Sequence, residues 1–144
     1  MKKIFFDPGD TTGICVFDED WGIEKLMQLS LDELIQWAAN YEEPVDIIGY
    51  EKFIVFRQKA MQQTGSKMKV SQAIGVIKMM AARLKVKALI EQAPDIKPIA
   101  LRWSKIKMPS QHSQSHQWDA FLHGFYFAYK NGRIKSNVTG LAEH

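Results

Sequence analysis

Ile4-Phe5-Phe6-Asp7-Pro8-Gly9-Asp10-Thr11-Thr12-Gly13 is the stretch from which the rest of the fold can be worked out. The apolar residues before Asp7 predict a strand over about residues 3–7, and Pro8-Gly9 predicts a tight turn. Ile14-Cys15-Val16-Phe17 predicts a second strand, over about residues 13–18, so that the two strands form a hairpin. Asp7 is then fixed at the mouth of a rigid strand, which is the kind of position that a metal-holding carboxylate needs.

The segments after the hairpin predict an α/β protein. Ile23 to Leu29 predicts a third strand in a meander, and Ser30 with Glu33 predicts a capping box that starts a helix over 31–40. The remaining predicted elements are a strand over 45–51, a helix over 67–85, a strand over 86–90, a short helix over 96–103 and a final helix over 110–130 that stops at Asn131-Gly132. This order favours a mixed five-stranded sheet with helices on both faces. The sequence contains no linker, so residues 1–144 are expected to form one domain.

Composition limits the classes of protein that the chain can belong to. Its 144 residues are 46% hydrophobic, which is enough to bury a real core. No apolar stretch approaches the roughly 20 residues of a membrane span, and Asp7 interrupts any signal-like run, so no membrane partner is expected. Cys15 is the only cysteine, which excludes an intrachain disulfide and favours a reducing, cytoplasmic setting.

Charge is distributed unevenly along the chain. Residues 1–51 hold 12 acidic side chains against 3 lysines, whereas residues 52–144 hold 16 lysines and arginines against 4 acids. Such a division predicts a basic surface for a polyanion, built from the second part of the sequence. The alternative is that the acidic and basic segments pair with each other across the fold.

Three acids and one histidine occupy positions that suit a metal site. Asp7 ends the first predicted strand, Glu51 ends the fourth, and Asp119 lies on the last helix. If the first and fourth strands are neighbours, Asp7 and Glu51 meet at one edge of the sheet, where Asp119 can reach them. His116 is three residues before Asp119 and so shares its helical face. Crowded carboxylates suit hard cations such as Mg²⁺, and two ions about 4 Å apart can promote hydrolysis of a phosphodiester.

Each of these residues also has a purely structural interpretation. Asp-Pro-Gly is a common turn tripeptide, Glu51 can end a strand in solvent, and Asp119 with His116 can form a surface pair. His123 is interpreted as a packing histidine among apolar neighbours, and Met79-Met80 as part of the core. The joint pattern of acids, rather than any single residue, favours the metal site.

Three acidic segments carry a resemblance to a known family. They are Phe5-Phe6-Asp7-Pro8-Gly9 with Thr12-Gly13, then Ile47-Ile48-Gly49-Tyr50-Glu51, and then His116-Gln117-Trp118-Asp119-Ala120. Together they resemble the RuvC family of Holliday junction resolvases, within the RNase H-like nucleases. Ala73-Ile74-Gly75, and Ile90 to Pro94 followed by Lys97, also stand where that family has a helix and a strand before a Pro-Lys stretch. The resemblance spans about residues 3–130 and implies an α/β RNase H-like fold, with a mixed five-stranded sheet and helices on both faces.

The resemblance implies a set of catalytic residues that also bind metal. They are Asp7, Glu51, His116 and Asp119, with His116 in a place where the family usually has an acid. The implied cofactor is Mg²⁺, in two ions, with Mn²⁺ as an alternative because imidazole favours softer ions. No nucleotide cofactor is expected, since an actin-like ATPase with a similar phosphate loop needs two such domains.

The resemblance also implies partners. Branched DNA is expected to contact the basic residues Lys52, Arg57, Lys59, Lys67, Lys69, Lys97 and Lys105. Phe53 and Phe56 are candidates for wedging against unstacked bases, or else for anchoring their loop in the core. A homodimer is expected, with the helix of Ile77 and Met80 as its surface unless that apolar face is filled by the sheet of the same chain.

The function that these expectations define is metal-dependent cleavage of branched DNA, with Holliday junction resolution by paired nicks. Two alternatives stay open. One is a related RNase H-like nuclease that acts on flaps, forks or RNA. The other is a catalytically degenerate, structure-specific DNA-binding module, against which the retention of all three acids argues.

Overall fold

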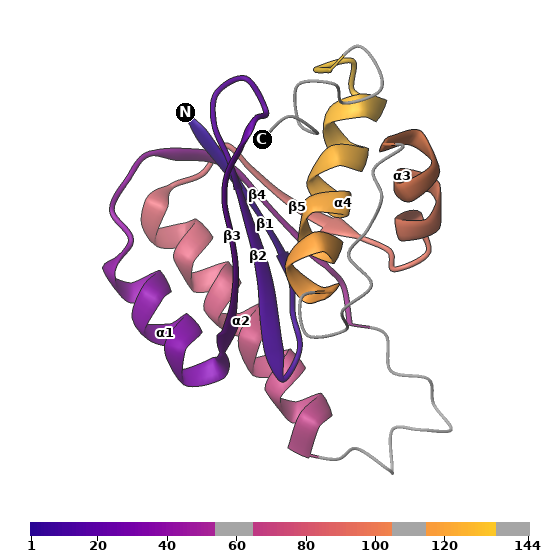
Figure 1. Cartoon of the computed structure of the whole chain (residues 1–144). Coiled ribbons are helices and arrows are strands. Elements are labelled where there is room, and N and C mark those ends of the chain that lie inside the picture. Colours follow the sequence, from indigo (N-terminus) through magenta and orange to yellow (C-terminus); the bar gives the residue numbers. More distant parts are fainter. Residues whose placement is uncertain (54–64, 105–114, 135–144) are drawn as a thin grey trace.

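A five-stranded mixed sheet forms the centre of the molecule, as the computed structural model in Figure 1 shows. The structure describes residues 1–53, 65–104 and 115–134. The strands are β1 (Lys2–Asp7), β2 (Thr11–Phe17), β3 (Ile23–Ser30), β4 (Val45–Glu51) and β5 (Ala88–Gln92), and their order across the sheet is β3-β2-β1-β4-β5. The predicted hairpin and meander are thereby confirmed.

Strand pairing brings the ends of β1 and β4 together. The meander β1-β2-β3 is antiparallel, whereas β4 runs parallel to β1 and β5 runs parallel to β4. Phe6 pairs with Tyr50 in the register of β1 and β4. Asp7 and Glu51, which follow these residues, therefore leave the sheet at the same edge, as the sequence predicted for neighbouring strands.

Helices cover both faces of the sheet (Figure 1). On one face, α1 (Leu31–Asn40) and α2 (Gly65–Leu84) pack on alternate strand residues such as Ile4 and Phe6. On the other face, α4 (Ser115–Lys130) packs over Phe5 and its neighbours, with α3 (Ile96–Ser104) beside it. Because side chains alternate along a strand, Asp7 shares the face of Phe5 and lies under α4.

Local sequence signals account for several element boundaries. Ser30 caps α1, its hydroxyl accepting from the amide of Glu33 while the Glu33 carboxylate accepts from the amide of Ser30, so the predicted capping box is confirmed. Gly132 adopts a φ of +67° just after α4, which fits the predicted stop. The part of the predicted final helix over 110–114 lies outside the described residues.

The fifth strand was predicted two residues too early. Lys85 has a φ of +55°, and the amide of Val86 bonds back to the carbonyl of Ala81, so this segment forms the exit from α2. The strand begins only at Ala88. Val86 is apolar and packs against the core before the strand begins, so the sequence gave no signal for the exact start.

The burial of α2 decides one open alternative and corrects one expectation. Ile77 and Met80 are 0% and 2% exposed and pack in the core, so this apolar face is filled by the sheet of the same chain, as one of the two alternatives held. Met79, which was predicted to be core, is 72% exposed. Within the described part of the chain, no helix is long and apolar enough to cross a membrane.

Candidate metal centre

Asp7 and Glu51 form the strand-borne half of the candidate site. The side chain of Asp7 is 6% exposed and that of Glu51 is 17% exposed. Each follows a fully paired strand residue, so its backbone is held in place by the ladder between β1 and β4. Oxygen atoms of the two carboxylates lie within 4.8 Å of each other, so the two charges would repel unless cations lie near them.

The first turn of helix α4 packs closely against the sheet. Gly13 makes this close approach possible, since a Cβ there would lie 1.9 Å from the carbonyl oxygen of His116. The side-chain oxygen of Gln28, on β3, accepts hydrogen bonds from the amides of His116 and Gln117 at 3.1 and 3.3 Å. These amides at the start of a helix have no intrahelical partner, so Gln28 fixes the N-terminus of α4.

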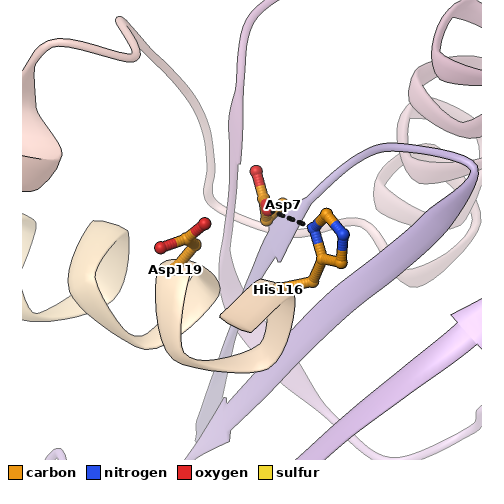
Figure 2. A group of neighbouring side chains, drawn as sticks. All are labelled: Asp7, His116 and Asp119. Atoms are coloured by element: carbon orange, nitrogen blue, oxygen red, sulfur yellow. Dashed lines mark hydrogen bonds and ion pairs between the residues drawn. The ribbon is translucent and has the colours of Figure 1, made fainter. Parts of the chain in front are cut away.

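His116 reaches from α4 to Asp7 (Figure 2). Nδ1 of His116 lies 3.0 Å from Oδ2 of Asp7. This hydrogen bond raises the pKa of His116. Burial raises the pKa of Asp7, with the nearby Glu51 and Asp119 adding to the effect and the contacts with His116 and Lys97 opposing it. Both shifts favour a proton held between the two side chains.

Lys97, on α3, forms ion pairs with two of the carboxylates through its ammonium group. Its Nζ lies 3.1 Å from Oε1 of Glu51 and 3.5 Å from Oδ2 of Asp119. Although burial opposes it, the negative charge of Asp7, Glu51 and Asp119 raises the pKa of Lys97. Burial also works against ionisation of Glu51, but the hydrogen bond from His123 and the charge of Lys97 prevail and lower the pKa of Glu51 to about 2. Lys97 was predicted as a phosphate contact, and it lies among the acids themselves.

His123 belongs to the site, although its sequence neighbours suggested only packing. It is 0% exposed, as predicted, but Nε2 lies 3.2 Å from Oε1 of Glu51 and Nδ1 lies 2.7 Å from Oε1 of Gln92. The sequence offered one signal for this role, because His123 lies four residues after Asp119 on the same helical face, but its apolar neighbours were given more weight. An imidazole buried on the same helical face as Asp119 must find polar partners, and the strand ends supply them.

The donor atoms fit a divalent cation. Asp7, His116 and Asp119 form one group in which ligand atoms lie within 4.8 Å of one another, and Asp7, Glu51 and His123 form a second. Ligands of an ion bound at about 2.1 Å lie roughly 3–4 Å apart, so a small side-chain adjustment suffices. Asp7 is common to both groups. Figure 2 shows the first group, with Asp7 on a strand and the other two side chains on adjacent turns of one helix.

The structure describes some of the remaining residues that were predicted to contact DNA. Lys52 follows Glu51 directly and is exposed, and its amide bonds to the carbonyl of Gln92 at 2.8 Å. Lys69, on α2, is exposed and Phe53 is partly buried. Arg57, Lys59, Lys105, Phe56 and the side chain of Lys67 lie outside the described residues.

The strand order and the mixed pairing define an RNase H-like α/β fold. Comparison with solved structures finds the same architecture in T. thermophilus RuvC, solved in complex with a Holliday junction substrate. The TM-score is 0.60 at 13% sequence identity, over 95% of this chain and 98% of that one. No family model and no curated protein matches the sequence. The predicted RuvC-like fold is thus confirmed by structure.

Proposed function

We propose that this chain is a metal-dependent endonuclease that cleaves branched DNA and resolves Holliday junctions by paired nicks. The observation that carries the proposal is the convergence of Asp7, Glu51, His116 and Asp119 on one edge of the sheet. These residues come from two strands and a helix, and the same fold is found in a RuvC that was solved with a junction substrate. The likeness supports a nuclease, and the donor set supports a metal centre.

The residues of the site have separable roles in this proposal. Mg²⁺ or Mn²⁺, in two ions, would supply water activation and neutralisation of the leaving oxygen. Asp7 is buried and held by the sheet, and its carboxylate belongs to both donor groups. Asp119 and His116, on α4, are the other members of the first donor group. Glu51, at the end of β4, belongs to the second donor group.

Basic side chains around the edge would hold the DNA. Lys52 and Lys69 are exposed, and neither forms an ion pair with another described residue, so both can contact phosphates. Lys97 is proposed to meet the scissile phosphate, and the position of its ammonium between Glu51 and Asp119 supports this role. Phe53, two residues after the end of β4, is proposed to contact unstacked bases at the branch point.

Paired nicks require two active sites, so we propose a homodimer. An apolar groove between α1 and α2 is a surface that a second copy could cover. It is lined by Ile35, Ala38, Ala39, Gln72, Gly75, Val76, Met79, Met80 and Arg83. Met79 and Ile35 are 72% and 41% exposed there. The groove lies on the face of the sheet opposite α4, so a partner on it leaves the metal centre open to DNA.

A cleavage assay tests the proposal. The purified chain is incubated with end-labelled four-way junction, flap, fork, RNA–DNA hybrid and linear duplex, with Mg²⁺ or Mn²⁺. Symmetric paired nicks in the junction are the expected result. If another of these nucleic acids is cleaved preferentially, it takes the place of the four-way junction as the proposed substrate. Junction binding without cleavage under either metal would overturn the nuclease in favour of a binding module.

A further inference from the structure

His123 is a fully buried imidazole whose two nitrogens are both engaged. It lies one turn after Asp119 on α4 and spans the ends of two parallel strands. Glu51 and Gln92 are direct neighbours in the register of β4 and β5, and His123 contacts both. The imidazole therefore bridges a cross-strand pair from the helix above it.

The proton positions in this chain of contacts follow from the chemistry of Glu51. Its ionised carboxylate only accepts hydrogen bonds, so Nε2 of His123 must carry a hydrogen and donate it. Gln92 can present either its oxygen or its amide nitrogen to Nδ1, so it can complete the second bond. A ring nitrogen that carries a hydrogen has no lone pair for a cation. His123 therefore does not ligate metal through Nε2 while this bond holds, although it lies within one of the donor groups.

Both contacts of the Glu51 carboxylate use the same oxygen. Among the described residues, Nε2 of His123 and Nζ of Lys97 approach Oε1, at 3.2 and 3.1 Å. Fixing one oxygen of a carboxylate on a stiff strand also fixes the direction of the other. Gln92 is 8% exposed and is held by the β4–β5 ladder, so it gives the imidazole a rigid support.

We propose that His123, supported by Gln92, is a positioning residue that orients the carboxylate of Glu51 toward the metal centre. The inference rests on the proposed function, in which Glu51 is a metal ligand. Hydrogen-bond partners behind a metal ligand set its orientation, and their loss commonly lowers metal affinity by about 10–100-fold. Among the described side chains, His123 and Lys97 are the hydrogen-bond donors to Glu51.

Two amide substitutions separate the two contacts of His123. In His123→Gln, the amide takes the place of Nε2 and can still donate to Glu51. In His123→Asn, the amide takes the place of Nδ1, so it keeps the contact with Gln92 and loses the one with Glu51. Both bury an amide of similar polarity, so a purely structural role predicts similar effects of the two. Circular dichroism and thermal unfolding of the full chain establish that each variant folds.

Metal affinity is then measured with Mn²⁺ alone, by the loss of the free-ion electron paramagnetic resonance signal. We expect His123→Asn to weaken Mn²⁺ binding by about 10–100-fold and His123→Gln to restore most of it. Gln92→Leu, which leaves His123 in place without its support, is expected to weaken binding less than His123→Asn does. Equal affinities in the Asn and Gln variants would overturn the inference.

A crystal structure of each variant, grown without metal, tests the inference independently of the proposed function. We expect Glu51 to keep its side-chain orientation in His123→Gln and to lose it in His123→Asn. An unchanged Glu51 in both variants would overturn the positioning role. If the unmodified chain binds no Mn²⁺, the metal-centre proposal fails, and the orientation of Glu51 still decides whether His123 positions it.

Discussion

Nδ1 of His116 and Oδ2 of Asp7 lie 3.0 Å apart, although 109 residues separate them in the sequence. The contact joins the first turn of α4 to the end of β1 at the centre of the candidate site. A cation bound directly to both Nδ1 and Oδ2 would have to displace the proton of this hydrogen bond, because a nitrogen that ligates a metal carries no hydrogen. The same pair therefore governs both the pH dependence of the metal-free protein and its affinity for metal.

The first prediction concerns pH. The pKa of His116 is raised by its hydrogen bond to Asp7, so the bond stabilises the folded state fully below about pH 6.5, the ordinary pKa of histidine. That contribution is lost as the pH rises through the folded-state pKa. Nuclear magnetic resonance titration of the imidazole protons should give His116 a pKa above the ordinary value, and Asp7→Asn should lower it. His116→Gln assigns the resonance, and an unchanged pKa in Asp7→Asn would contradict the pairing.

The second prediction concerns catalysis by Asp7. Asp7→Asn should abolish junction cleavage while junction binding stays the same or tightens, because a negative charge that faces phosphate is removed. Gel-shift and nicking assays with Mg²⁺ measure the two effects. Asp32→Asn is the control, since Asp32 is an exposed acid in the first turn of α1, on the other face of the sheet. Full nicking by Asp7→Asn would remove Asp7 from the mechanism.

The third prediction concerns the seating of α4. Gly13→Ala should lower the free energy of unfolding by about 3 kcal/mol and greatly reduce metal binding, because its Cβ would overlap the backbone of His116. Gly75→Ala, on α2, is the control, since no atom lies within 4 Å of the new Cβ. Alanine there should raise the free energy of unfolding by about 0.5–1 kcal/mol, as helix propensity requires. Urea unfolding measures both, and a Gly13→Ala variant as stable as Gly75→Ala would refute the close approach.

Local sequence signals predicted some parts of the fold and of the candidate site, and contacts between distant segments account for the rest. The turn at Pro8-Gly9, the capping box of Ser30 and Glu33, and the acids at strand ends are local signals, and they predicted the hairpin, α1 and the strand-borne half of the site. The partners of His123 were not predictable in this way. They come from positions 51 and 92, and only the strand order shows that these lie side by side.

A second limit concerns which face of a helix is free. Helical spacing places Ala73, Ile77 and Met80 on one face, and all three are buried. Met79 falls outside that spacing and is exposed in the groove beside α1. The expectation that Met79 is core treated the two methionines as one pair, although the spacing includes only Met80.

The fourth prediction concerns Lys97. Its ammonium and a divalent cation both bind next to Glu51 and Asp119, so they compete for the same charge. Lys97→Met should destabilise the metal-free protein and should increase the rise in Tm that Mg²⁺ or Mn²⁺ produces. Differential scanning calorimetry with and without metal measures this rise. Lys78→Met, at an exposed position of α2, is the control and should leave it unchanged. A smaller rise in Lys97→Met than in the unmodified chain would show that the lysine supports metal binding instead of competing with it.

The fifth prediction concerns the groove between α1 and α2. If a second copy covers it, light scattering after size exclusion should give about twice the chain mass of 16.5 kDa. Met79→Glu should shift the mass toward one chain, because a carboxylate would be buried in an apolar contact without a partner. Met68→Glu is the matched control, since Met68 is 57% exposed on the same helix and does not line the groove. A dimer that survives Met79→Glu would move the interface to another surface. If the chain is a monomer in solution and still makes paired nicks, junction resolution does not require a stable dimer.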